Sequence, residues 1–193
     1  MTAAEILLVR HGATEWSATG RHTGRTDIPL SPAGQQAAVA LRGRLPAHPD
    51  LVLVSPRQRA VQTCELAGLG AGAQIADVQA DDDLREWDYG DYEGLTTPEI
   101  RATRPGWDMW RDGCPNGETA ADVGARADRV VARLAAIGDG IAVVFAHGHL
   151  LRVLGARWAG LPPEDGAVFA LDPATVSVLG WERERRVIRG WNC

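Results

Sequence analysis

Short apolar runs alternate along this chain with segments in which apolar residues recur every three or four positions. The runs at 6–9, 51–54 and 141–146 have the length of buried strands, and the last is far too short to cross a membrane. The tail, 175–181 and 186–191 about a charged turn, is typical of a strand pair. This alternation predicts a three-layer α/β/α fold, a mostly parallel sheet with helices on both faces.

Helix start signals follow the predicted strands. Ser31-Pro32 and Ser55-Pro56 each combine an N-cap with a proline at the first helical position, and predict helices that run to Pro46 and to about Leu66. Thr119 and Asp122 resemble a capping box before a helix through Ile137, and a further helix is expected over 150–158. No repeat or linker marks a boundary, so a single domain over 1–193 is expected.

Composition and charge narrow the class of protein. The 193 residues are 45% hydrophobic and 23% charged, which is typical of a globular chain with a sizeable core. The formal charge of -5 argues against a nucleic-acid or anionic membrane surface as partner. All 20 basic residues are arginines. Arginine suits forked recognition of phosphate or carboxylate, and a composition bias of the genome explains its use equally well.

The cysteines and the N-terminus bear on location. Cys64, Cys114 and Cys193 are widely spaced and form no Cys-x-x-Cys pair, so neither a disulfide framework nor a zinc site is indicated. The N-terminus lacks the basic region and cleavage site of a signal peptide. A cytoplasmic protein without a membrane partner is expected, and the sequence leaves both a monomer and a homo-oligomer open.

Three predicted strands end in polar sequences that suit an anion. These are Arg10-His11-Gly12, the segment 55–59, and His147-Gly148-His149. An Arg-His-Gly corner by itself is also compatible with a capped strand whose histidine packs on a loop. Parallel strands share one carboxyl edge, however, so their imidazoles, arginines and helix N-termini converge into a site for a dianion with a nucleophile in it. A loop at 85–94 adds carboxylates.

These blocks resemble the histidine phosphatase superfamily, the phosphoglycerate mutase-like enzymes, over nearly the whole chain. The matching blocks are 9–31, 55–63, 86–94 and 147–152, in the order of the family. Segments 85–94, 110–114 and 145–149 look most like the branch that contains broad acid phosphatases and sedoheptulose-1,7-bisphosphatase.

The resemblance implies a phosphatase for small phosphorylated metabolites, sugar bisphosphates among them. His11 would attack phosphorus and form a phosphohistidine. Arg10, Arg59 and His147 would surround the equatorial oxygens in the transition state. Glu86 would protonate the leaving alkoxide and then activate water. The scheme needs neither a metal nor a cofactor.

The resemblance also implies substrate contacts. The expected substrate-binding residues are Ser17, His22, Thr23 and Gly24 of the opening block, together with Ser55 and Arg152, whose positions contact a second phosphate in the bisphosphatase branch. Ser55 and Arg152 also fit an N-cap and a helix-surface charge. The family commonly has Asn where this chain has Ser17, and serine cannot offer an amide fork. This departure weakens the mutase alternative.

Several residues keep a second interpretation. Glu93 and Asp88 are alternative proton donors. Trp87, Trp107 and Trp110 form either a substrate wall or packing. His149 is expected to be a helix-start residue, and His48 an exposed turn residue.

Three other functions remain open. A cofactor-dependent phosphoglycerate mutase would carry a longer insertion between Arg59 and Glu86 and a closing tail, so hydrolysis is favoured. A non-catalytic phospho-ligand module would have lost catalytic groups that are all present here. A metal enzyme using His11, His147 and His149 lacks the carboxylate or cysteine ligands that would complete it.

Overall fold

The computed structural model describes residues 4–70 and 78–193, and this part of the chain forms one six-stranded sheet in the order β3-β2-β4-β1-β5-β6. The strands are β1 (Glu5–Arg10), β2 (Leu51–Val54), β3 (Val78–Ala80), β4 (Ile141–Ala146), β5 (Val176–Glu182) and β6 (Arg185–Gly190). The helices are α1 (Glu15–Ala18), α2 (Pro32–Ala40), α3 (Gln58–Leu66), α4 (Thr97–Thr103), α5 (Met109–Asp112), α6 (Ala120–Ala135) and α7 (Gly148–Trp158). Short 3₁₀ turns are η1 (Leu41–Gly43), η2 (Asp82–Leu84), η3 (Gly90–Tyr92) and η4 (Pro163–Val168).

The strand directions place three strand ends at one edge. β3, β2, β4 and β1 run parallel to one another, whereas β5 pairs antiparallel with β1 and β6 pairs antiparallel with β5. The ladder continues beyond the strands, because the His11 amide donates to the Ala146 carbonyl at 3.0 Å and the Ser55 amide to the Phe145 carbonyl at 2.9 Å. The residues that follow β1, β2 and β4 are therefore neighbours, and the predicted α/β fold is confirmed.

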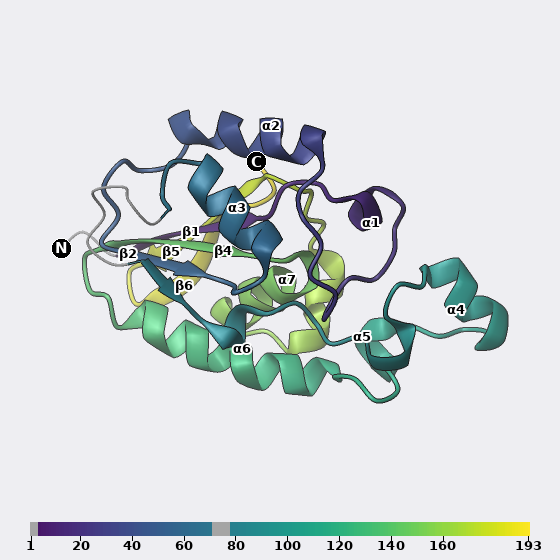
Figure 1. The fold of residues 1–193 in the computed structure, drawn as a ribbon. Helices are drawn as coiled ribbons and strands as arrows, with labels where there is room; N and C mark the ends of the chain where they lie inside the picture. Colours follow the sequence, from purple (N-terminus) through teal and green to yellow (C-terminus); the bar gives the residue numbers. More distant parts are fainter. Residues whose placement is uncertain (1–3, 71–77) are drawn as a thin grey trace.

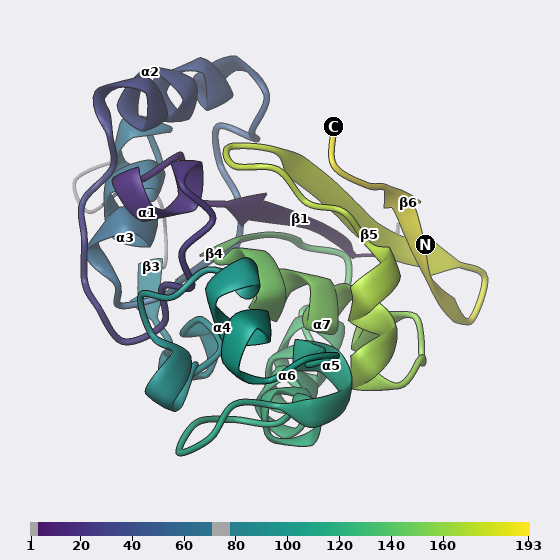
Figure 2. The same ribbon diagram turned by 90° about the vertical axis from the view of Figure 1, so that its right-hand side faces the viewer.

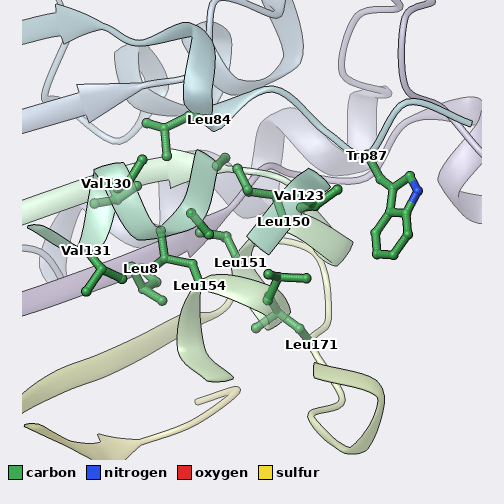
Figure 3. Packing of buried hydrophobic residues seen from close by; sticks show 14 of the residues in the cluster. Leu8, Leu84, Trp87, Val123, Val130, Val131, Leu150, Leu151, Leu154 and Leu171 are labelled. Atoms are coloured by element: carbon green, nitrogen blue, oxygen red, sulfur yellow. The ribbon is translucent and has the colours of Figure 1, made fainter. Parts of the chain in front are cut away.

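Helices cover both faces of the sheet, with α2 and α3 on one side and α6 and α7 on the other (Figures 1 and 2). The two faces receive alternate strand residues, as the period of two in a strand requires. Leu7 and Val9 pack toward α2 and α3, while Ile6 and Leu8 pack toward α6 and α7. Figure 3 shows the second of these cores, where leucines of α7 meet valines of α6. α4 and α5 lie beyond the carboxyl edge of the strands (Figure 1).

The end of α2 and the start of α3 differ most from the predicted boundaries, while α6 ends at Ala135 and α7 begins at Gly148, two residues before their predicted positions. Helix α2 begins after Ser31 as expected, but it ends at Ala40 and tightens into η1 well before Pro46. Helix α3 begins at Gln58 after Arg57, so the predicted start at Ser55 is wrong. The Ser55 hydroxyl has a tertiary partner instead of capping the helix. The Thr119–Asp122 capping box at the start of α6 is confirmed.

Two further observations complete the fold. The connection between Arg59 and Glu86 includes residues 71–77, which lie outside the described residues. None of the helices formed by residues 4–70 and 78–193 combines the length and the apolar character needed to cross a membrane.

Candidate active site

His11 follows β1 directly and is 5% exposed. Its Nδ1 atom lies 2.7 Å from the Gly12 carbonyl oxygen, which can only accept, so Nδ1 carries the proton. The Nε2 atom therefore holds a lone pair, and no described residue bonds to it. Burial, followed by the nearby charges of Arg59 and Arg10, lowers the pKa of His11 well below its usual value. The imidazole is neutral at pH 7, as an attacking nitrogen must be.

Gly12 lets this corner pack closely against helix α2. A Cβ atom at Gly12 would lie 2.4 Å from the Gly34 carbonyl oxygen, which no side chain tolerates. The Gly12 amide donates to the Thr63 hydroxyl of α3 at 3.1 Å. The glycine of the Arg-His-Gly motif is thus required by packing, and it fixes His11 against two helices.

Arg59 and His147 form a buried pair beside His11, and both side chains are fully buried. The Arg59 Nε donates to His147 Nδ1 at 3.2 Å, so the other ring nitrogen carries the proton. His147 Nε2 then donates to the Ser55 hydroxyl at 2.7 Å. The Arg59 Nη atoms donate to the Thr26 and Thr23 carbonyls at 3.0 and 2.9 Å. Arg59 is thereby held in place by the loop that contains Thr23 and Thr26 and by His147.

Glu86 is held by the first turn of α7. Its carboxylate accepts the amides of Trp87 and Leu150, each at 2.9 Å, and of His149 at 3.1 Å. A carboxylate is stabilised at a helix N-terminus by the free amides and by the helix dipole. Strand β4 therefore leads into a helix whose start positions an acid contributed by a distant loop.

Arg10 lies over the glycine that begins α7. Its guanidinium donates to the Leu171 carbonyl. A Cβ atom at Gly148 would lie 3.2 Å from the Arg10 guanidinium carbon, so a larger residue would displace the cation. The buried Arg10 Nε has no hydrogen-bond partner among the described residues. Burial lowers the pKa of Arg10, and the negative charge of Glu86 opposes that shift. This leaves a desolvated cation with donor capacity unused.

A cavity of about 280 Å³ joins these groups. Of the site residues expected from the sequence, it is lined by Arg10, His11, Ser17, His22, Thr23, Glu86 and Arg152. Arg59 and His147 lie in the layer behind it. Ser17 also closes a capping box with Thr14 at the start of α1, accepting its amide at 2.9 Å.

Ser55 and Gly24 are placed differently from the expectation. Ser55 was predicted to contact a second phosphate, but it is fully buried and its hydroxyl bonds to His147. Ser55 lies beneath the His147 imidazole, has no exposed surface and does not line the cavity. The Gly24 amide donates to both oxygens of Glu93 at 3.0 Å and stays outside the cavity.

The alternative proton donors have other partners. Glu93 accepts the amides of Gly24 and Thr26, so it organises that loop. Asp88 forms an ion pair with Arg25 at 2.6 Å. Trp87 and Trp107 are buried in the core, as packing predicts, and neither lines the cavity.

Part of the cavity wall consists of residues that were not predicted from the sequence to contact a ligand. Arg21, Tyr89 and Thr97 line it, and so does the side chain of His149, which was expected only to start a helix. Tyr89 belongs to the 85–94 block, but nothing in its spacing indicates that its hydroxyl reaches His149 Nδ1, at 2.6 Å. The contact joins residues sixty positions apart.

The three imidazoles suggested for a metal do not converge. His11, His147 and His149 bond to Gly12, to Arg59 and Ser55, and to Tyr89 respectively. Within the described ranges, His, Cys, Asp and Glu side chains form no group of three or more that could hold a metal ion.

Comparison with known proteins decides the family. The model of the histidine phosphatase superfamily, branch 1, matches residues 6–193. The chain belongs to the histidine phosphatase superfamily. It is 43% identical to an acid phosphatase of Mycobacterium tuberculosis, over 92% of this chain and 86% of that protein. It is 42% identical to sedoheptulose 1,7-bisphosphatase of Saccharomyces cerevisiae, over 80% of this chain and 67% of that protein.

Solved structures agree with this assignment. The structure of an open reading frame product from Mycobacterium tuberculosis superposes with a TM-score of 0.87 at 39% identity, covering 98% of this chain and 97% of that one. The predicted family and fold are therefore confirmed. As a histidine phosphatase, this protein is a hydrolase that acts on phosphomonoesters.

Replacing Arg126 by methionine is expected to lower the free energy of unfolding of this histidine phosphatase by about 2–3 kcal/mol. Arg126 is 8% exposed, pairs with both oxygens of Glu118, and donates to the Asp83 and Arg85 carbonyls beside Glu86. Its loss leaves partly buried acceptors unpaired.

Arg129→Met is the matched control on the same helix. The Arg129 side chain is 62% exposed and pairs with Asp83, so its loss should cost less than about 1 kcal/mol. Urea unfolding of both variants measures the difference. Equal losses of unfolding free energy in the two variants would mean that the partly buried hydrogen bonds of Arg126 do not stabilise the fold.

Stability is expected to fall as the pH drops below 6.5. Burial lowers the pKa of His11, His147 and His149 well below the usual 6.5. Below that pH the unfolded chain binds protons that the folded chain refuses, so stability decreases with falling pH. Each histidine contributes about 1.4 kcal/mol per pH unit until its folded pKa is reached. Urea unfolding at pH 7.5 and 5.5 measures the loss, and equal stabilities would contradict neutral burial.

Proposed function

We propose that this histidine phosphatase hydrolyses phosphomonoesters of small polyhydroxylated metabolites, sugar phosphates among them, through a phosphohistidine on His11. One observation carries the proposal. A neutral imidazole with an unprotonated, unbonded Nε2 lies in the wall of a cavity that also contains the Arg10 cation and the Glu86 carboxyl group. These are the nucleophile, the charge stabiliser and the acid that phosphoryl transfer requires.

In the first step, His11 Nε2 attacks phosphorus in line with the ester oxygen. The N–P bond forms as the P–O ester bond breaks, and Glu86 gives its proton to the departing oxygen. The metaphosphate-like transition state spreads negative charge over three oxygens. The positive charges of Arg10 at the cavity wall and of Arg59 behind it stabilise that negative charge. The proton stays on His11 Nδ1, which donates it to the Gly12 carbonyl oxygen, so the ring keeps its orientation throughout.

In the second step, water attacks the phosphohistidine. Glu86, now ionised, takes a proton from that water, the N–P bond breaks, and inorganic phosphate leaves with His11 regenerated. The three amides on Glu86 hold the carboxylate in place for both proton transfers. The same residue thus serves as acid and then as base.

The position of Arg152 is evidence for a substrate with a second anionic group. Its Nε and one Nη donate to the Gly166 and Ala167 carbonyls at 3.0 and 2.8 Å, and its guanidinium carbon lies 4.6 Å from the centre of the Trp110 ring. The other Nη has no partner among the described residues. Arg152 lines the same cavity as His11, and such a fixed guanidinium binds phosphate or carboxylate well. Sugar bisphosphates are therefore proposed within the substrate class.

The test is a panel of sugar monophosphates, sugar bisphosphates and phosphoglycerates, scored for both free phosphate and isomerised product. Phosphate release without isomerisation supports the proposal. Isomerisation that depends on a bisphosphate primer would replace it with a mutase. Binding without turnover would indicate a non-catalytic module.

A cytoplasmic location is part of the proposal. It is supported by Cys64, Cys114 and Cys193, which are all free thiols, as is usual in a reducing compartment. Cell fractionation tests it, and recovery outside the cytoplasm would overturn it.

A further inference from the structure

Tyr89 and His149 form a hydrogen-bonded pair in the cavity wall whose protons can be assigned. The Tyr89 hydroxyl lies 2.6 Å from His149 Nδ1, and it has no other partner among the described residues. If Nδ1 carried the proton, the buried phenol would have no acceptor for its own. The phenol therefore donates to Nδ1, and the proton of the neutral ring is on Nε2.

The protonation states agree with this assignment. Burial raises the pKa of Tyr89 well above its usual value, so the phenol keeps its proton. Burial, then the charges of Arg152, His22 and Arg10, lowers the pKa of His149 well below its usual value. The imidazole is thus an uncharged donor.

The His149 ring is fixed in direction by its neighbours. It meets the rings of Trp110 and Trp87 nearly edge-to-face, with centroids at 5.5 and 6.5 Å. The His22 ring lies 6.2 Å away. His149 lines the cavity. Its Nε2 atom has no hydrogen-bond partner among the described residues, and it is not fully buried. The Nε2–H group therefore faces the cavity and is unoccupied by protein.

The position of His149 relates this donor to the reaction. Its own amide donates to Glu86, the residue proposed to protonate the ester oxygen. On its other side, Trp110 carries the Arg152 guanidinium. The imidazole thus lies between the proposed acid and the proposed second anion contact. Because Glu86 is proposed to protonate the ester oxygen, a donor at this place would face the alcohol portion of a substrate.

We propose that Tyr89 is a positioning residue and His149 a specificity-determining residue, together selecting substrates with a hydroxyl oxygen near the phosphoester. Tyr89 holds one tautomer of His149, and the His149 Nε2–H group donates to that hydroxyl. An uncharged donor favours a neutral acceptor, whereas Arg152 favours an anion. The inference rests on the proposed function and deepens it to substrates hydroxylated beside the ester.

The test compares glycerol 3-phosphate with n-propyl phosphate, which has the same carbon chain and no hydroxyl. The wild type should favour glycerol 3-phosphate in kcat/KM by about fivefold, the worth of one neutral hydrogen bond. Tyr89→Phe and His149→Phe should each bring this ratio close to one, chiefly through the KM for glycerol 3-phosphate. Tyr92→Phe is the matched control, since Tyr92 packs on Trp107 and its hydroxyl has no described partner. It should keep the wild-type ratio.

A second measurement distinguishes control of the His149 tautomer by Tyr89 from a packing role of Tyr89. In the wild type, ¹⁵N NMR of histidine-labelled protein should show His149 protonated at Nε2 only, and in Tyr89→Phe a mixture of the two tautomers. Equal kcat/KM of the wild type for both esters, or an unchanged ratio in Tyr89→Phe with an unchanged tautomer, would overturn the inference. Either result leaves the proposed hydrolysis standing. If the wild type releases phosphate from neither ester nor from any sugar phosphate, the proposed function itself fails.

Discussion

Replacing His11 by alanine is expected to abolish turnover, lowering kcat by about 10⁴-fold or more. The other imidazoles near the cavity have different surroundings, since the charge beside His22 is the Glu93 carboxylate. His149 Nε2 carries a proton, and His147 uses both ring nitrogens within the protein. The measurement is phosphate release from a sugar phosphate under saturating conditions.

Trapping the intermediate makes this prediction specific. The enzyme is mixed with a sugar phosphate that carries ³²P in its phosphate group. The wild-type protein should retain ³²P after quenching in alkali and lose it after quenching in acid, because phosphohistidine is acid-labile. The His11→Ala variant should take up no ³²P. His48→Ala is the control, since His48 is exposed and outside the cavity, and it should behave like the wild type. Normal turnover by a folded His11→Ala variant would disprove the proposed mechanism.

Glu86→Gln is expected to slow hydrolysis of alkyl phosphates by about 10²- to 10⁴-fold, the range of general acid catalysis. Activated aryl phosphates should lose far less in the step that forms the phosphoenzyme, because their leaving groups depart without a proton. Rapid-quench measurement of phosphoenzyme formation with both classes of ester separates that step from the later attack of water. Similar losses on both classes would mean that another acid donates the proton.

The Glu86→Gln variant should keep most of the hydrogen bonds of Glu86, and two other variants test whether a different carboxylate donates the proton. The amide of glutamine offers one acceptor oxygen, so it can keep the Trp87 and Leu150 amides while losing that of His149. Asp88→Asn and Glu93→Gln alter the two carboxylates that the sequence left as alternatives. Neither variant should show a dependence on the leaving group. If Asp88→Asn does, the proton donor has been assigned to the wrong residue.

Much of the fold was predictable because its signals are local. The apolar runs became β1, β2 and β4, and the Thr119–Asp122 box begins α6 as predicted, since a capping box is complete within four residues. The predicted end of α2 and start of α3 were wrong. At Ser55 the same hydroxyl that could cap a helix bonds to His147, ninety-two residues away. Such a choice between two partners cannot be read from a neighbouring proline.

The identity of the chemical groups and the strand ends that carry them follow from the order of residues, because motif spacing and the edge of a parallel sheet bring His11, Arg10 and His147 to one place. The partners of each group depend on the folded chain. It holds Glu86 on the amides of α7, places Ser55 beneath His147, and joins Tyr89 to His149 in the cavity wall. Tautomers, buried hydrogen bonds and cavity walls depend on contacts between distant segments, and these contacts form only when helices pack on both faces of the sheet.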